Sequence, residues 1–154
     1  MSRDEIHETI LHFFDVIDGE YAPEEREKRL SIALDRLALA SHFADYDFDE
    51  TDYPDSPRKD YDELREIVSP RFPDCGYYNV AHNVTTDIGV ESVSVGDAID
   101  DICDIANDLS EVSWRWENNS IDDALWYFRE SYIYHWGHHL RDLQVYLLKK
   151  VLGQ

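Results

Sequence analysis

The stretch YIYHWGHHLRDL, residues 132–143, contains three of the seven histidines of the chain. His135 and His139 are four residues apart, and this spacing places two side chains one turn above each other on a helix. Imidazole rings combined with carboxylates form sites for zinc, manganese or iron. The histidines could therefore bind a metal ion, or they could take part in the packing of a helix.

Helical rotation separates these histidines into two groups. We take Trp136 as the centre of the buried face and count about 100° of rotation per residue. His139 then lies about 60° and His135 about 100° to one side, with Asp142 a little further out, and His138 is nearly opposite. We expect His135 and His139 at one edge of the packing face and His138 in solvent. The apolar residues within about 40° of the centre are Leu125, Tyr132, Leu140, Leu143 and Leu147.

Arg129 projects close to the centre of the same face. A buried guanidinium group is costly unless an acid pairs with it. The preceding segment GDAIDDICDIANDL, residues 96–109, supplies candidate acids at helical spacing. Asp101 and Asp108 lie nearest its core face, about 100–120° from the centre. We predict a polar seam between the last two long helices, formed by Asp101, Asp104, Asp108, Arg129, His135, Trp136, His139 and Asp142.

Three interpretations of this seam compete. It could be structural, with Arg129 paired to an aspartate and the histidines donating to carboxylates. It could bind a divalent metal through His135, His139, Asp101 and Asp108, since helical bundles draw such ligands from facing helices. The chain has no HExxH motif, however, and a nearby arginine would oppose a cation. Finally, Arg129 and the two histidines could hold an organic or anionic ligand. No catalytic residue is assigned, because no GxSxG motif or glycine-rich phosphate loop occurs.

The elements that position the seam follow from apolar spacing and capping residues. Apolar residues at helical spacing predict a helix over residues 3–18 that ends at Gly19. Pro23 begins a second predicted helix, which runs to about Ala44. Residues 45–60 form an acidic loop. Ser56 and Pro57 predict the start of a short helix that Pro70 ends. That short helix would bury Tyr61, Leu64, Ile67 and Val68.

The second half of the chain contains the two helices of the seam. Residues 73–93 read as an irregular loop that caps the end of the bundle. Ser94 or Asp97 then caps a helix that runs to about Glu117, and Ser120 caps a last helix from residue 121 to about 151. We predict one all-α domain over residues 1–154, a mostly up-and-down helical bundle of four long helices plus one short helix.

The net charge of −20 is the most unusual global property of the chain. It argues against nucleic acid or an anionic membrane as a partner, because both require a basic surface. No apolar run approaches the roughly 20 residues of a membrane span. The acidic N-terminal segment also lacks the basic start of a signal peptide, so we expect a cytoplasmic protein with free thiols at Cys75 and Cys103. The acidity fits a solvated surface, salt adaptation, DNA mimicry or capture of a basic protein partner.

Two segments carry a resemblance to a known family. GDAIDDICDIANDLSE and DDALWYFRESYIYHWGHHLRDL resemble an uncharacterised bacterial family, domain of unknown function 5063. Phe128 stands where that family usually has tryptophan, and His138 falls on a variable position. The resemblance implies a small helical bacterial protein without an established activity. The matching positions are Asp100, Asp101, Asp104, Asp108, Trp126, Arg129, Ser131, His135, Trp136, Gly137, His139 and Asp142.

Charge and motifs together favour a non-enzymatic binding or interaction module that captures a basic protein partner. The alternative is a metal- or small-ligand-binding helical bundle centred on the polar seam, with hydrolysis as one reaction it could catalyse. A divalent metal is the cofactor that this alternative would require. The sequence does not indicate an oligomeric state.

Overall fold

The first two helices begin at residues suited to a helix start. In the computed structural model, which describes residues 1–57 and 59–154, α1 spans Arg3–Asp18 and α2 spans Pro23–Ala40. The Ser2 side chain accepts a hydrogen bond from the Glu5 amide, and the Glu5 carboxylate accepts one from the Ser2 amide. The helix predicted over residues 3–18 is confirmed, whereas α2 ends about one turn before the predicted Ala44.

The turn between α1 and α2 is closed by a buried arginine that the sequence did not single out. Arg26 is only 5% exposed. Its guanidinium group donates to the backbone oxygens of Val16, Ile17 and Gly19, which are among the carbonyls left without a helical partner where α1 ends. Charged donors aimed at these carbonyls also complement the negative end of the helix dipole.

The short helix α3 spans Tyr61–Val68 and is followed by a 3₁₀ turn at Ser69–Arg71. The predicted start at Ser56 is wrong, because the Asp60 side chain caps the helix by accepting from the amides of Asp62 and Glu63. Of the four residues predicted to be buried here, only Val68 is fully buried, and Ile67 is exposed.

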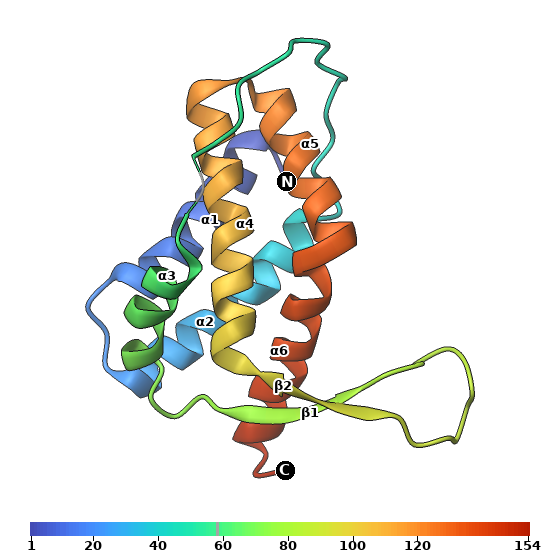
Figure 1. Cartoon of the computed structure of the whole chain (residues 1–154). Helices are drawn as coiled ribbons and strands as arrows, with labels where there is room; N and C mark the ends of the chain where they lie inside the picture. The colour runs from blue at the N-terminus through green and yellow to red at the C-terminus, as the bar shows by residue number, and fades with distance from the viewer. Residues whose placement is uncertain (58) are drawn as a thin grey trace.

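A two-stranded antiparallel sheet replaces the irregular loop predicted over residues 73–93. Strand β1 spans Tyr77–Ala81 and pairs with β2, Val93–Asp97, so that Tyr77 lies opposite Asp97 and Ala81 opposite Val93. Valine and tyrosine are favoured in strands, which accounts for the pairing. The hairpin does not cap the bundle: it starts beside the helices and its tip projects away from them (Figure 1).

The C-terminal half contains α4 (Ala98–Asn118), α5 (Ile121–Ser131), a π-helical turn (Tyr132–Trp136) and α6 (Gly137–Val151). Of the two caps that the sequence allowed for α4, Ser94 and Asp97, the structure has Asp97, and Ser120 caps α5 as predicted. The single helix expected over residues 121–151 is interrupted by the π-helical turn.

The predicted fold class is therefore wrong in two respects. The sheet shows that the protein is mostly helical rather than all-α. Among the helices in the described ranges only α4, with 21 residues, exceeds 20 residues, so four long helices plus one short helix is not the arrangement found.

Helix packing places α4 at the centre of the molecule. It packs against α5 and α6 and also contacts α1 and α3, while α1 packs on α2 and α2 on α6. Trp136, Phe13, Phe72 and Phe128 are the largest fully buried side chains of this core. The thiols of Cys75 and Cys103 are free, as predicted.

No helix among the described residues combines the length and the apolar character that a membrane crossing requires.

A candidate metal centre between two helices

The π-helical turn sets the direction of the histidines. Within it, the Gly137 amide donates to the carbonyl oxygen of Tyr132, five residues earlier, instead of four as in an α-helix. A Cβ atom at position 137 would lie 2.2 Å from that oxygen, so the close approach requires glycine. Trp136 is fully buried beside the turn, and its Nε1 donates to Ser131 Oγ at 3.0 Å. Single π-helical turns inside α-helices are frequent at functional sites.

Arg129 lies outside the seam, and its predicted burial is wrong. Its side chain is 48% exposed, and its Nη1 lies 3.6 Å from a carboxylate oxygen of Asp45, in the acidic loop. The extra residue in the π-helical turn rotates the preceding helix by about 100° relative to Trp136, so Phe128 takes the buried position instead. The Arg129 guanidinium group therefore does not oppose a metal ion in the seam. It also cannot bind an anionic ligand there, as one interpretation had predicted.

Two buried carboxylates of α4 each hold one histidine. His135 Nδ1 lies 2.6 Å from Asp108 Oδ2, and His139 Nδ1 lies 2.8 Å from Asp101 Oδ1. Asp101 and Asp108 are only 5% and 7% exposed. An ionised carboxylate can only accept hydrogen bonds, so the hydrogen in each pair is on Nδ1, and the lone pair of a neutral ring is on Nε2.

Two tyrosines orient these carboxylates in turn. Tyr78, on β1, donates its hydroxyl to Asp101, and Tyr127, on α5, donates to Asp108 Oδ1 at 3.2 Å. Burial raises the pKa of both tyrosines, and the neighbouring carboxylates raise it further, so both hydroxyls remain protonated donors. Sequence reasoning missed both residues. Tyr78 could have been found only by recognising its strand, and no spacing pattern distinguishes Tyr127.

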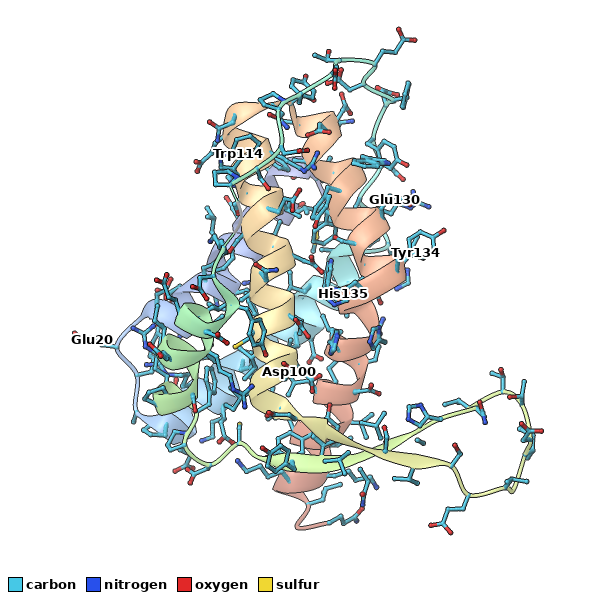
Figure 2. The ribbon with its side chains drawn as sticks, in the orientation of Figure 1. Glu20, Asp100, Trp114, Glu130, Tyr134 and His135 are labelled. Carbon is cyan, nitrogen blue, oxygen red and sulfur yellow. The ribbon has the colours of Figure 1, made fainter. Side chains whose placement is uncertain are left out.

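Asp104 completes a group of three side chains that could hold a metal ion. One ligand atom from each of Asp104, His135 and His139 lies within 4.8 Å of the others. The Nε2 atom of His139 is 3.3 Å from Asp104 Oδ2. Figure 2 shows His135 between α4 and the C-terminal helical segment, whereas Tyr134 and Glu130 point away from α4.

The electrostatic environment favours a positive charge at this position. Burial raises the pKa of Asp104, and the negative charge of Asp100 raises it further. Burial disfavours protonated His139, but the hydrogen bond to Asp101 and the charge of Asp104 outweigh burial, so the pKa of His139 is raised. Either a proton on His139 or a bound cation would therefore compensate the surrounding carboxylates.

The ligand group differs from the predicted His135, His139, Asp101 and Asp108. Asp101 and Asp108 contact the Nδ1 atoms of the imidazoles. Asp104 is the carboxylate that lies close to both histidines in the group of possible ligands. Asp142 is half-buried and stands outside this group, although burial and the charge of Asp101 raise its pKa. His138 is exposed, as expected, and its ring centroid is 4.2 Å from that of His139.

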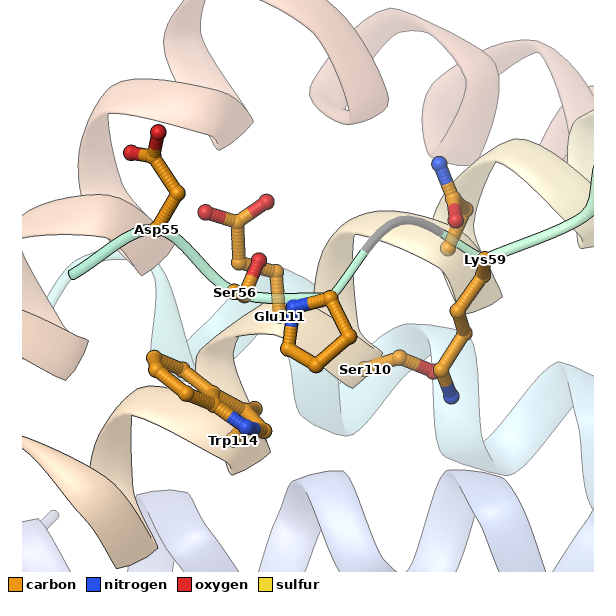
Figure 3. A pocket seen from close by; sticks show the side chains of 8 residues that line it. Asp55, Ser56, Lys59, Ser110, Glu111 and Trp114 are labelled. Carbon is orange, nitrogen blue, oxygen red and sulfur yellow. The ribbon is translucent and has the colours of Figure 1, made fainter.

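A separate cavity of about 700 Å³ lies between the acidic loop and α4 (Figure 3). None of its lining residues belongs to the polar seam, so it is a distinct feature of the surface. The residues are Asp55, Ser56, Pro57, Lys59, Asn107, Ser110, Glu111 and Trp114.

Comparison with known proteins identifies the family and the fold. No curated protein matches the chain. The crystal structure of protein BF1032 from Bacteroides fragilis, a structural genomics target, is similar in fold, with a TM-score of 0.69 and 14% sequence identity. The match covers 96% of this chain and 87% of that one. The model of the family described as Domain of unknown function (DUF5063) matches residues 29–150, and the chain therefore belongs to this family, as its resemblance implied.

Proposed function

We propose that the protein binds one divalent transition metal ion through Asp104, His135 and His139. The observation that carries this proposal is the pair of buried carboxylate–histidine contacts, Asp108 to His135 and Asp101 to His139. Histidines that bind metals almost always donate their other ring N–H to a carboxylate, a carbonyl or water, which fixes the tautomer and the ring orientation. With each Nδ1 atom engaged, each Nε2 atom is the ligating nitrogen.

The donor set also indicates the class of metal. Two imidazoles and one carboxylate suit zinc, manganese(II) or iron(II), and they are too rich in nitrogen for calcium or magnesium. The ligands come from two facing helical segments, as is common for metal sites in helical bundles. Asp101 and Asp108 would then act as orienting residues, and Tyr78 and Tyr127 would hold those two carboxylates in place.

A purely structural role makes a different prediction for the same contacts. In that case protonated His139 bridges Asp101 and Asp104, and the seam fixes how α4 and α6 pack. Removal of a buried partner would then destabilise the fold without loss of any ligand.

The test is metal content together with folding. Untagged, metal-free protein is incubated with zinc, manganese(II) or iron(II), desalted, and analysed by inductively coupled plasma mass spectrometry. We expect one equivalent of metal in the wild type and none in His135→Ala or His139→Ala, with helical content by circular dichroism unchanged. His138→Ala is the matched control, because this histidine belongs to the same segment but not to the ligand group. Wild-type protein without metal, or equal losses in the control, would overturn the proposal.

A further inference from the structure

We infer that the metal ion keeps a coordination position for an exchangeable ligand, and that this position favours a neutral nitrogen donor such as imidazole over an anion. This inference rests on the proposed metal site. It concerns which class of molecule can reach the ion, a property that the three protein ligands do not specify.

The open position follows from the number and exposure of the ligands. Zinc sites that serve only structure are normally closed by four protein ligands, whereas sites that bind substrates have three protein ligands and a water molecule. The group found among the described residues contains three side chains. One of them, His135, is 46% exposed, so solvent reaches the ion from that side. The two nearby buried carboxylates, Asp101 and Asp108, are engaged by the Nδ1 atoms.

The surrounding fold does not depend on a metal to hold its helices together. Ile102 and Ile105 of α4 and Leu140 and Leu143 of α6 are fully buried in one hydrophobic core, and the two helices pack against each other. Small domains that require a structural metal lack such a core, and their folding free energy comes from the metal itself. The ion in this protein is therefore free to serve ligand binding.

The charges around the group decide which ligand is favoured. Besides Asp104, four carboxylates surround the histidines: Asp100, Asp101, Asp108 and Asp142. A divalent ion leaves the formal charge of this cluster negative, so an incoming anion is repelled and a neutral donor is not.

Two arginines that could have changed this balance are engaged elsewhere. Arg65 Nη2 lies 2.6 Å from Asp97 Oδ2, and Arg129 extends toward Asp45. Neither guanidinium group is thus available to attract an anionic ligand to the ion.

The experiment uses the full chain loaded with cobalt(II), whose visible absorption reports its coordination. Imidazole and azide are titrated separately, at a pH where imidazole is neutral, in low salt and in added sodium perchlorate, a weakly coordinating salt. We expect both ligands to change the spectrum. The apparent Kd of azide should fall severalfold as salt screens the carboxylates, and that of imidazole should stay constant.

Asp142→Asn provides the matched variant, because Asp142 belongs to the charged surroundings but not to the ligand group. Removal of one neighbouring negative charge in a watery environment should tighten azide binding about two- to threefold and leave imidazole binding unchanged. Asp87→Asn, at the exposed hairpin tip, should change neither.

Each outcome has one meaning. Failure to bind cobalt overturns the proposed metal site itself. Cobalt binding without a spectral response to either ligand shows a closed coordination sphere and overturns only the present inference. Azide binding that is as insensitive to salt as imidazole binding, and unaffected in Asp142→Asn, overturns its electrostatic part.

Discussion

At the residue scale, the candidate site depends on two carboxylates that lie outside the group of three possible metal ligands. Asp108 and Asp101 each contact the Nδ1 atom of one histidine, and each accepts a hydrogen bond from a tyrosine hydroxyl. A chain of fixed contacts of this kind limits the rotation of the imidazole rings, which lowers the entropy lost when a ligand is bound.

The first prediction tests this orienting role. In Asp108→Asn the side chain keeps its shape but loses its charge, so His135 is held less firmly and its Nε2 becomes less basic. We expect the affinity for zinc to fall about tenfold, the lower end of the effect of such substitutions. Competition with a chelating dye measures the change. Asp122→Asn, on α5 outside the group, is the control, and an unchanged affinity in Asp108→Asn would contradict the orienting role.

Helical periodicity predicted part of this residue-level arrangement. It placed His135 and His139 at the edge that faces the aspartates of α4. The count of rotation from Trp136 holds for these two residues because His135 lies beside Trp136 in the π-helical turn and His139 lies in α6. It failed for Arg129, which lies on the other side of that turn. It also could not tell an orienting aspartate from a ligating one, because Asp101, Asp104 and Asp108 lie on neighbouring parts of the same helix face.

At the element scale, the π-helical turn is the feature on which the histidine positions depend. It changes the rotation between α5 and α6, so that Phe128 and Trp136 both point into the core. Phe128 and Tyr132 make edge-on ring contacts with Trp136, which favour this arrangement.

The second prediction concerns Gly137→Ala. The new Cβ would lie 2.2 Å from the Tyr132 carbonyl oxygen, so the backbone must shift. We expect a loss of about 1–3 kcal/mol in the free energy of unfolding, as for other overpacked sites, together with weaker metal binding. Urea denaturation measures the first effect.

Gly76→Ala is the matched control for this prediction. A Cβ there has no neighbour within 4 Å, so it should leave stability and metal binding nearly unchanged. Equal effects of the two substitutions would show that the close contact at Gly137 is unimportant.

Capping residues predicted several of the helix starts, although not the start of α3. Asp97 and Ser120 cap helices because their side chains accept from the free amides of the first turn, a local rule that needs no tertiary information. The hairpin was missed because its partner strands are separated by eleven residues and only one of them shows a period of two. The π-helical turn was missed because the rotation count assumes 3.6 residues per turn throughout.

At the scale of the whole molecule, the net charge of −20 should limit stability at low salt. Like charges repel one another more strongly in the compact state, and ions screen that repulsion. The predicted capture of a basic protein partner depends on the same charge and stays a prediction.

The third prediction is that sodium chloride raises the melting temperature. Screening that contributes about 1 kcal/mol would raise Tm by about 2–4 °C for a chain of this size. Calorimetry at low and moderate ionic strength measures the shift. Local ion pairs such as Glu27 with Lys150 would be weakened by salt, so a Tm that falls with salt would show that such pairs outweigh the general repulsion.

The projecting hairpin has a practical consequence for protein engineering. Its tip is exposed over residues 81–91 and stands away from the helices (Figure 1). Exposed tips of this kind are where insertions are best tolerated and where proteases cut first. A short epitope placed there would allow immobilisation without a polyhistidine tag, whose own imidazoles would compete for the metals that the assay has to count.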